Sequence, residues 1–216
     1  MTEINLLKSL PTPKRNILNR NTKKTDNHIK ISRQYGKEYF DGDRSFGYGG
    51  YKYDGRWVPV AKDITDYYGL IKGSKILDVG CAKGFLVKDL VDLGFEAYGI
   101  DISEYAIDNA PKDVKNRLKI GNAKKLPYDD NSFELVISLN TIHNLDRNEC
   151  KMAIQEIQRV SKTSSFIQVD SYTNENEKSI FEDWVLTAKF YGYPNEWLKL
   201  FKESGYTGDW YWTIIK

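Results

Sequence analysis

The sequence has 216 residues, the length of one globular domain, and its 40% hydrophobic and 29% charged residues exclude a chain that is disordered throughout. A formal net charge of +2 does not give the strongly basic surface of a nucleic-acid-binding domain, and two cysteines with two histidines are too few for a disulfide framework or a zinc site. The first residues lack the apolar core of a signal peptide and no apolar run approaches the roughly 18 residues that cross a bilayer, so we expect a cytoplasmic protein outside the membrane, without a metal ion.

The N-terminal third divides into two parts of different character. Residues 1–34 are polar and rich in Asn, Lys and Arg, without a helical or strand period, which predicts a mobile or loosely docked arm. Residues 35–57 alternate Tyr and Phe with Gly, which predicts a shaped aromatic loop. Pro59 opens a predicted helix that ends before Gly73. We therefore expect an arm over 1–34, a lid loop and helix over 35–73, and a core over 74–216.

Strands and helices alternate through the core. Strands are predicted at 75–79, 96–100, 117–120, 133–139, 165–170 and 209–215. Helices are predicted between them, and over 175–191 and 194–204 before the last strand. Asp146 and Glu149 form a capping box for the helix that leads to the fifth strand. This order predicts an α/β fold, a Rossmann-like three-layer sandwich around a mostly parallel sheet of six or seven strands, with an N-terminal aromatic lid segment.

Residues with binding chemistry follow the predicted strands, at the edge where an open α/β sheet binds its ligands. They are Asp78, Gly80, Cys81, Ala82 and Gly84 at the first strand, Asp101 and Ile102 at the second, Asn122 and Ala123 at the third, and Leu139 and Asn140 at the fourth. This ordered set resembles the S-adenosylmethionine-binding signature of class I methyltransferases. A nicotinamide fingerprint would need glycines in place of Ala82 and Phe85, so the pattern disfavours that cofactor.

The resemblance implies roles for the residues of the first strand and its turn. Gly80 and Gly84 would let the backbone approach the methionine part of S-adenosylmethionine, and the amides of the following helix would favour its carboxylate. Asp78 would lie beside the cationic end of the cofactor, directly or through water. Cys81 is interpreted as a small packing residue rather than a nucleophile. Lys83 is interpreted as a solvated side chain.

The resemblance assigns the remaining cofactor contacts to the other strand ends. Asp101 would accept hydrogen bonds from both ribose hydroxyls, and Ile102 would cover one face of the adenine. Asn122, where many relatives have Asp, would accept from the adenine amino group and donate to a ring nitrogen. Leu139 and Asn140 would lie along the methionine moiety. Many relatives also end in a strand hairpin, whereas only one strand fits after Gly205, unless residues 185–192 supply another.

His143 follows the fourth strand and is the one near-neutral titrating group placed to act as a general base on the acceptor. The alternative is that it fixes the loop or contacts the cofactor. Alignment of the acceptor with a sulfonium methyl group also carries much of this reaction without a base. Asp170 and Tyr172 close the fifth strand, where they either line the same cleft or serve in capping and packing.

The aromatic loop is the expected acceptor lid, since lids exclude water from reacting groups. Its Arg44, Tyr48, Tyr51 and Arg56, together with Tyr172, are the predicted substrate residues, although a purely structural strip is an equal alternative. Hydroxyl and guanidinium donors favour a small polar acceptor that is phosphorylated or nucleotide-linked.

The layout of the chain also resembles compact bacterial methyltransferases of small-molecule and surface-polysaccharide pathways, which implies O- or N-methylation in capsule or other surface-glycan biosynthesis. The alternatives are an RNA or protein methyltransferase that docks through the basic arm, and a non-catalytic regulator that binds the cofactor. The sequence does not predict an oligomeric state.

Overall fold

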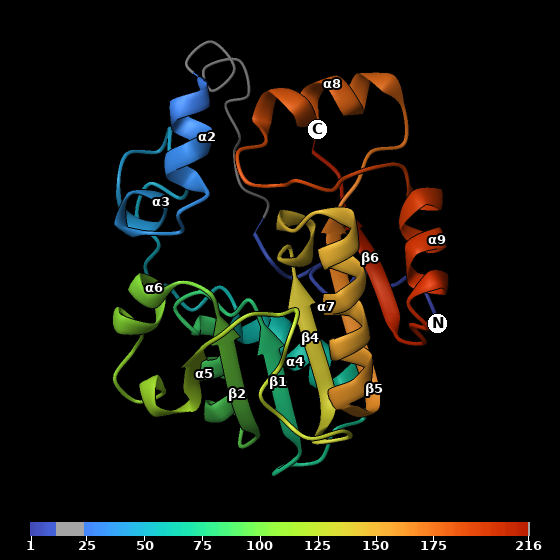
Figure 1. Ribbon diagram of the computed structural model, residues 1–216. Coiled ribbons are helices and arrows are strands. Elements are labelled where there is room, and N and C mark those ends of the chain that lie inside the picture. The colour runs from blue at the N-terminus through green and yellow to red at the C-terminus, as the bar shows by residue number, and fades with distance from the viewer. Residues whose placement is uncertain (12–23, 216) are drawn as a thin grey trace.

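The computed structural model describes residues 1–11 and 24–215 (Figure 1). Its centre is a sheet of six strands in the order β3-β2-β1-β4-β5-β6, and every neighbouring pair is parallel. The predicted α/β fold is thus confirmed with the smaller of the two strand numbers. The strands are β1 Lys75–Val79, β2 Glu96–Asp101, β3 Leu118–Ile120, β4 Phe133–Leu139, β5 Ser161–Asp170 and β6 Asp209–Thr213.

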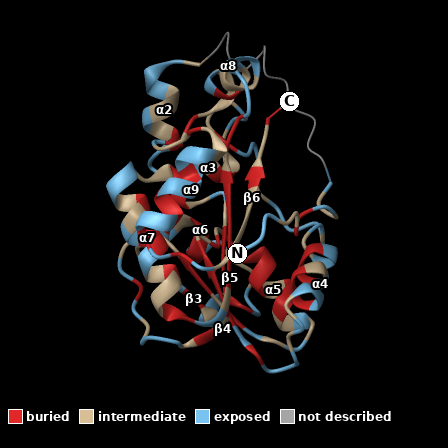
Figure 2. Cartoon of the chain, turned by 90° about the vertical axis from the view of Figure 1, so that its right-hand side faces the viewer, coloured by how far each residue is buried: buried red, intermediate tan, exposed pale blue. Residues whose placement is uncertain are grey.

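Helices cover both faces of the sheet and bury two apolar layers (Figure 2). On one face, α7 (Arg147–Val160) and α9 (Pro194–Glu203) pack on side chains such as Val136 and Val169. On the other face, α4 (Val58–Tyr67) and α5 (Phe85–Asp92) pack on Ile137 and Phe166. Successive strand residues therefore point to opposite helical layers, which explains the continuous apolar runs of the central strands. The capping box of Asp146 and Glu149 at the start of α7 is confirmed.

The first residues of the chain extend the sheet rather than forming a loose arm. Ile4 N donates to Trp210 O at 2.9 Å, and Trp210 N donates to Thr2 O at 3.1 Å, so the N-terminal segment runs along the outer edge of β6. Leu6 and Leu7 are buried in the layer that holds α4 and α5. The prediction of a mobile or loosely docked arm is therefore wrong for these residues, since their apolar side chains reach the core. Residues 12–23 of the predicted arm lie outside the described residues.

Three helices lie beyond the ends of the strands, where α2 (Asp26–Ser32) and α3 (Lys37–Asp41) face α8 (Glu175–Trp184) (Figure 1). The α2 helix was not predicted, although Thr25 caps its first turn. The helix predicted over 175–191 ends at Trp184, because residues 185–193 turn back to pack on the sheet ends. A single bridge joins Ser171 to Gly192 there, so this segment adds no strand. Short helices also occur between β2 and β3, namely α6 (Glu104–Asp108) and η1 (Lys115–Arg117), and after β4, namely η2 (Ile142–Asn144).

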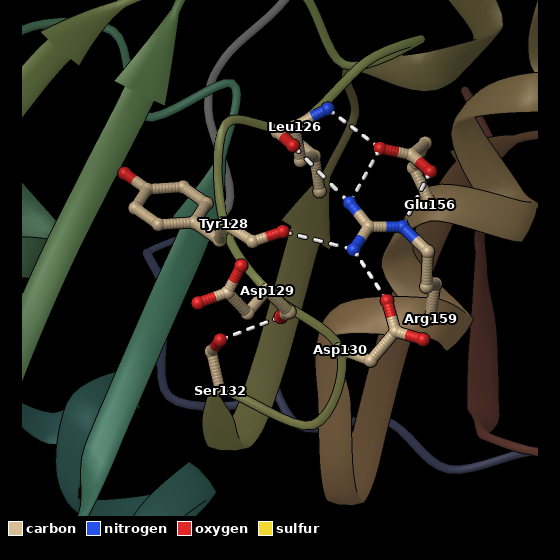
Figure 3. Close-up of polar contacts among 7 residues, drawn as sticks. All are labelled: Leu126, Tyr128, Asp129, Asp130, Ser132, Glu156 and Arg159. Atoms are coloured by element: carbon tan, nitrogen blue, oxygen red, sulfur yellow. Dashed lines mark hydrogen bonds and ion pairs between the residues drawn. The ribbon is translucent and has the colours of Figure 1, made fainter.

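Arg159 on α7 fixes the loop that enters β4 (Figure 3). Its guanidinium donates to the carbonyls of Leu126 and Tyr128 at 3.1 and 2.8 Å, and to Asp130 Oδ1 at 2.7 Å. Glu156, one turn earlier, accepts from Arg159 and also from the Leu126 backbone N at 2.7 Å. Five donors of one planar group are thus used to hold the chain between β3 and β4 against the helical layer. Within the described residues, no helix has the length and apolarity of a bilayer span.

Candidate active site

The carboxyl ends of β1, β2 and β4 open into one cavity of about 190 Å³, bounded on its outer side by α3 and the loop that follows it. Eight of the predicted cofactor residues line it: Gly80, Ala82, Asp101, Ile102, Asn122, Ala123, Leu139 and Asn140. Asp78, Cys81 and Gly84 lie in or behind its wall. The cavity also has lining residues that the sequence did not predict, among them Arg33, Tyr35, Tyr39, Asn144 and Lys189.

The turn after β1 is a cradle that only small residues fit. Gly80 has φ +86° and donates its N–H to the Ile100 carbonyl at 2.7 Å, and a β-carbon there would collide with the side chain of Thr141. Gly84, at φ +72°, begins α5, and a β-carbon there would lie 2.6 Å from Leu118. Ala82 accepts φ +51° between them. The backbone is therefore held close to the cavity, as a bound ligand would require.

Asp101 is the carboxylate of the cavity, and its geometry is set by two backbone donors. Ala82 N donates to Oδ2 at 2.7 Å, and Ser103 N donates to Oδ1 at 2.8 Å. Burial raises the pKa of Asp101, and the N–H groups of Ser103, Ala82 and Ile102 oppose that rise. A carboxylate accepts about four hydrogen bonds, so Asp101 keeps capacity for a further donor beyond these backbone groups. This acceptor fits a hydroxyl group such as those of the ribose of a nucleoside.

The neighbouring side chains fit a flat, weakly polar group beside that carboxylate. Ile102 lies at the cavity mouth with 55% of its surface exposed, unusual for an isoleucine that follows a buried strand. Asn122 Oδ1 accepts from Lys124 N at 3.0 Å, which fixes the amide while leaving its Nδ2 donors available. Asn144 Oδ1 is buried without a hydrogen-bond partner in the described structure. A buried acceptor of this kind costs free energy unless a ligand or water satisfies it.

Asp78 and Cys81 are buried beneath the turn. Burial and the charge of Asp101 raise the pKa of Asp78 to about 7, so this carboxyl is poised between neutral and ionised forms near neutral pH. A cationic group placed above the turn would favour the ionised form. Burial, together with Asp101 and Asp78, raises the pKa of the Cys81 thiol well above its ordinary value, which makes it a poor nucleophile.

His143 does not face the cavity as a general base would. The side chain is 4% exposed, and both ring nitrogens contact Asp170. Asp170 N donates to His143 Nδ1 at 3.0 Å, so the ring proton is on Nε2, which lies 3.5 Å from Asp170 Oδ2. Burial lowers the pKa of His143, and Asp170 partly opposes this. His143 is thus not among the residues that line the cavity, and its contacts favour the alternative, a histidine that fixes the loop after β4 to the end of β5, while the catalytic role stays a prediction.

The predicted substrate residues divide between the cavity and the surface around it. Tyr48 lines the cavity, and Tyr51 packs between Tyr48 and Phe85 with ring centroids 4.5 and 4.8 Å apart. Arg44 donates to the Gly47 carbonyl and lies over the ring of Trp184, away from the cavity lining.

The other two predicted substrate residues are not brought to the site. Arg56 is exposed and its Nη2 pairs with Asp54 at 2.5 Å, a local contact two residues away. Tyr172 is 4% exposed and packs on Phe181 and Tyr193 beneath α8. Neither residue lines the cavity, because Arg56 pairs with Asp54 and Tyr172 packs in an apolar cluster, and their role at the substrate site stays a prediction.

Lys83 is buried and holds the lid, contrary to the expectation of a solvated side chain. Its Nζ donates to Asp41 Oδ2 at 2.6 Å and to the Tyr51 carbonyl at 2.9 Å. Asp41 also accepts from Tyr105 at 2.7 Å and from Tyr51 N at 3.0 Å. Ser103 Oγ adds a bond of 2.5 Å to the Tyr35 carbonyl. The residues of the turn after β1 and of α6 thus tie the aromatic loop over the cavity.

Comparison with known families agrees with this geometry. A family model described as a methyltransferase domain matches residues 77–168, the stretch from β1 to β5 that carries the cradle, Asp101 and Asn140. This stretch is therefore similar to the methyltransferase domain, whose solved members with the same fold include methyltransferases that depend on S-adenosylmethionine. S-adenosylmethionine is the methyl donor of this family, and the cradle, the Asp101 carboxylate and the poised Asp78 of this stretch all fit it.

Two curated relatives act on different acceptors by their names. A sterol 4-C-methyltransferase of Caenorhabditis elegans is 27% identical over 180 residues, which cover 71% of this chain and 52% of that protein. A tRNA (carboxymethyluridine(34)-5-O)-methyltransferase of Arabidopsis thaliana is 32% identical over 146 residues, which cover 66% of this chain and 34% of that protein. The chain thus spans about half or less of their length, and their acceptors belong to different chemical classes.

The solved structure of a methyltransferase from Methanosarcina mazei has the same fold. It superposes with a TM-score of 0.55 at 21% identity, over 65% of this chain and 82% of that one. At this identity the likeness concerns the fold alone, so the acceptor has to be argued from the cavity of this chain.

Proposed function

We propose that the protein transfers a methyl group from S-adenosylmethionine to an oxygen or nitrogen of a small, polar acceptor held beneath the aromatic loop. The observation that carries the proposal is the single cavity that joins Asp101 and the glycine cradle to Tyr48, Tyr39 and Lys189. One end contains the Asp101 carboxylate, which can bind a nucleoside. The other end contains polar side chains from the lid and from residues 185–193. A donor and an acceptor bound there would lie side by side.

When bound, S-adenosylmethionine supplies an electrophilic methyl group on a cationic sulphur. The residues of the chain then have three tasks. Asp101 orients the ribose, Asp78 offers negative charge beneath the cradle, and the lid excludes water from the reacting atoms. Since His143 is engaged with Asp170, no side chain is assigned as a base, and alignment of the two reactants is proposed as the main source of rate.

The size and enclosure of the cavity favour a small molecule over a folded macromolecule as the acceptor. Tyr35, Tyr39 and Phe40 cover it from α3 and its N-terminal side, so that a base or side chain from a polymer would have to enter past the ring of Tyr48. A nucleotide-linked or phosphorylated sugar, as used in the synthesis of a surface glycan, is of the size and polarity that we propose.

Isotope transfer tests the proposal. The protein is incubated with S-adenosylmethionine that carries a deuterated methyl group and with a bacterial metabolite extract, and small molecules, RNA and protein are then separated and examined by mass spectrometry. We expect the label in a small polar molecule, and loss of that transfer with Asp101→Ala. Label in RNA or protein would identify a methyltransferase for macromolecules, and cofactor binding without transfer would identify a regulator.

A further inference from the structure

Two basic residues from distant parts of the chain, Arg33 and Lys189, line the cavity. Arg33, at the end of α2, reaches across so that Nη2 donates to the Ala188 carbonyl at 3.1 Å, beside Lys189. The backbone N of Lys189 donates to the His143 carbonyl at 2.9 Å, which holds this segment over the loop after β4. Arg33 is thus held through its guanidinium, and Lys189 through its backbone.

Among the described residues that line the cavity, Asp101 is the one carboxylate, and both of its oxygens already accept backbone N–H groups at the end of β2. Strands β1 and β4 lie between β2, which ends in Asp101, and β5. Lys189 is instead held by the segment that connects β4 to β5, so the two residues belong to different sides of the cavity. Asp170, at the end of β5, is near the Lys189 end of the cavity but is not one of its lining residues, and its Oδ2 lies 3.5 Å from His143 Nε2. Like charges in one cavity repel, so an arrangement of this kind favours an anionic ligand.

Asn140 adds a third donor to this end of the cavity, and its orientation is set from β6. Gln168 Nε2 donates to Thr213 Oγ1 at 2.8 Å, and Thr213 donates its single hydroxyl proton to Asn140 Oδ1 at 2.8 Å. The amide oxygen of Asn140 is thus turned towards β6, which leaves Nδ2 with its two N–H donors for the cavity. Asn140 also has φ +52°, a strained value for a residue with a side chain, and its N–H is held by the Gln168 carbonyl at 2.8 Å.

From these donors we infer that the end of the cavity next to β4 and β5 binds a phosphate or carboxylate group of the methyl acceptor. Arg33 and Lys189 supply the charge, Asn140 supplies a directed donor, and Thr213 is a positioning residue for Asn140. The inference rests on the proposed function and adds to it the charge of the substrate. The cofactor itself has a carboxylate, so the test separates the two sources of an anion.

Calorimetry with three probes makes this separation, at constant ionic strength because charge contacts depend on salt. The probes are S-adenosylhomocysteine, methylthioadenosine, which lacks the amino-acid carboxylate, and inorganic phosphate added to protein saturated with S-adenosylhomocysteine. We expect phosphate to bind with a Kd of about 1 mM, a weak affinity that suits a fragment of the acceptor. Arg33→Gln and Lys189→Gln should each weaken phosphate binding at least about fivefold, because each removes a charge-assisted hydrogen bond.

Matched variants distinguish a built subsite from general charge. Lys199→Gln removes an exposed lysine of α9 and should change phosphate binding less than about twofold. Thr213→Val keeps the branched shape but loses the hydroxyl, and should weaken phosphate binding about threefold or more, whereas Thr213→Ser should restore it.

Three results would overturn the inference. Phosphate that fails to bind, or that responds to Lys199→Gln as strongly as to Lys189→Gln, leaves no specific subsite. Weaker binding of S-adenosylhomocysteine with unchanged binding of methylthioadenosine in Arg33→Gln and Lys189→Gln would assign the cations to the carboxylate of the cofactor. If the wild-type protein binds S-adenosylhomocysteine and methylates only uncharged molecules, the inference fails while the proposed function stands. Failure of the wild-type protein to bind S-adenosylhomocysteine would reject the proposed function itself.

Discussion

Lys83 Nζ lies 2.6 Å from Asp41 Oδ2, and this ion pair joins the turn after β1 to the end of α3, where the aromatic loop begins. Only 7% of the Lys83 side chain and 23% of the Asp41 side chain are exposed. The contact links the glycine cradle to the aromatic loop. Lys83 lies between Ala82 and Gly84 of the cradle, and Asp41 is the residue after Phe40, which lines the cavity.

Lys83→Met is expected to lower the free energy of unfolding by about 3 kcal/mol, because it leaves Asp41 and a buried carbonyl without their cation. Urea denaturation followed by circular dichroism measures this loss. Lys62→Met is the matched control, since Lys62 forms an exposed pair with Asp66 and should lower the free energy of unfolding much less than Lys83→Met does. Equal losses of unfolding free energy for the two variants would show that the buried pair stabilises the protein no more than the exposed pair does.

Acid should weaken the same contact. Burial tends to raise the pKa of Asp41, but hydrogen bonds from Lys83, Tyr105 and Tyr51 N outweigh it and lower the pKa below its ordinary value of 3.8. A carboxyl with a lowered pKa contributes its stability above the ordinary value and loses it as the pH falls through the lowered one. Protease cleavage of the lid should therefore rise in wild-type protein below about pH 4, and the Asp41→Asn variant should lack this step.

Asp101→Asn should weaken the binding of S-adenosylhomocysteine by about 1.5 to 3 kcal/mol, the usual value of hydrogen bonds to a charged group. The change preserves size but replaces one oxygen acceptor by a donor, which then faces Ala82 N or Ser103 N. Calorimetry gives the dissociation constant, and Asp108→Asn at the exposed end of α6 serves as the control. An unchanged dissociation constant in folded protein would remove Asp101 from the cofactor site.

His143→Ala is expected to reduce stability by about 1 to 3 kcal/mol, because it leaves the Asp170 backbone N–H without its acceptor. The pKa of His143 is lowered in the folded protein, so the folded state favours the neutral ring. Its stability contribution is present above the ordinary pKa of 6.5 and decreases as the pH falls below that value. Thermal unfolding between pH 5 and 8 should show this slope in wild type and not in the variant. A loss of kcat of about 100-fold in stable protein would instead restore the role of a base.

Asp78→Asn should remove the pH dependence of the free energy of unfolding in a second pH range. With its pKa raised to about 7, Asp78 remains protonated in the folded protein where it is ionised in the unfolded chain. The folded state then holds more protons, so stability decreases as the pH rises from about 4 to 7. The variant should lose this decrease and bind S-adenosylmethionine more weakly at pH 8, and denaturation and calorimetry check both. If the variant and the wild type have the same dependence of stability on pH, Asp78 is not the group that titrates in this range.

The strand ends were predictable because they depend on local signals. A buried apolar run followed by Gly80 or Asp101 identifies both the end of a strand and the chemistry placed there, and the order of strands brings those ends to one edge. The sequence therefore predicts which of these residues line the end of the cavity that we propose for the cofactor. The capping box of Asp146 and the Pro194 start of α9 are equally local.

The acceptor end was not predictable in the same way, because its residues depend on long-range contacts. Arg33 had no periodic pattern around it, and only the carbonyl of Ala188, 155 residues away, shows where its guanidinium lies. Lys189 fell in a predicted helix that ends earlier in the structure. Arg56 and Tyr172 had suitable side chains, yet local partners occupy them. Residue type alone does not distinguish a free arginine from one paired with its neighbour.

The pairing of Thr2 and Ile4 with Trp210 has a consequence for the order of synthesis. The Thr2 backbone N also donates to Asp209 Oδ1, a contact that spans 207 residues, so the segment of Thr2 and Ile4 can pair only after β6 has been synthesised. Until β6 emerges, the apolar side chains of Leu6 and Leu7 lack a fixed edge beside them, and the growing chain presents an incomplete sheet. Nascent chains stalled before residue 209 should therefore remain sensitive to protease near their N-terminus, and become resistant once the Trp210 strand is released.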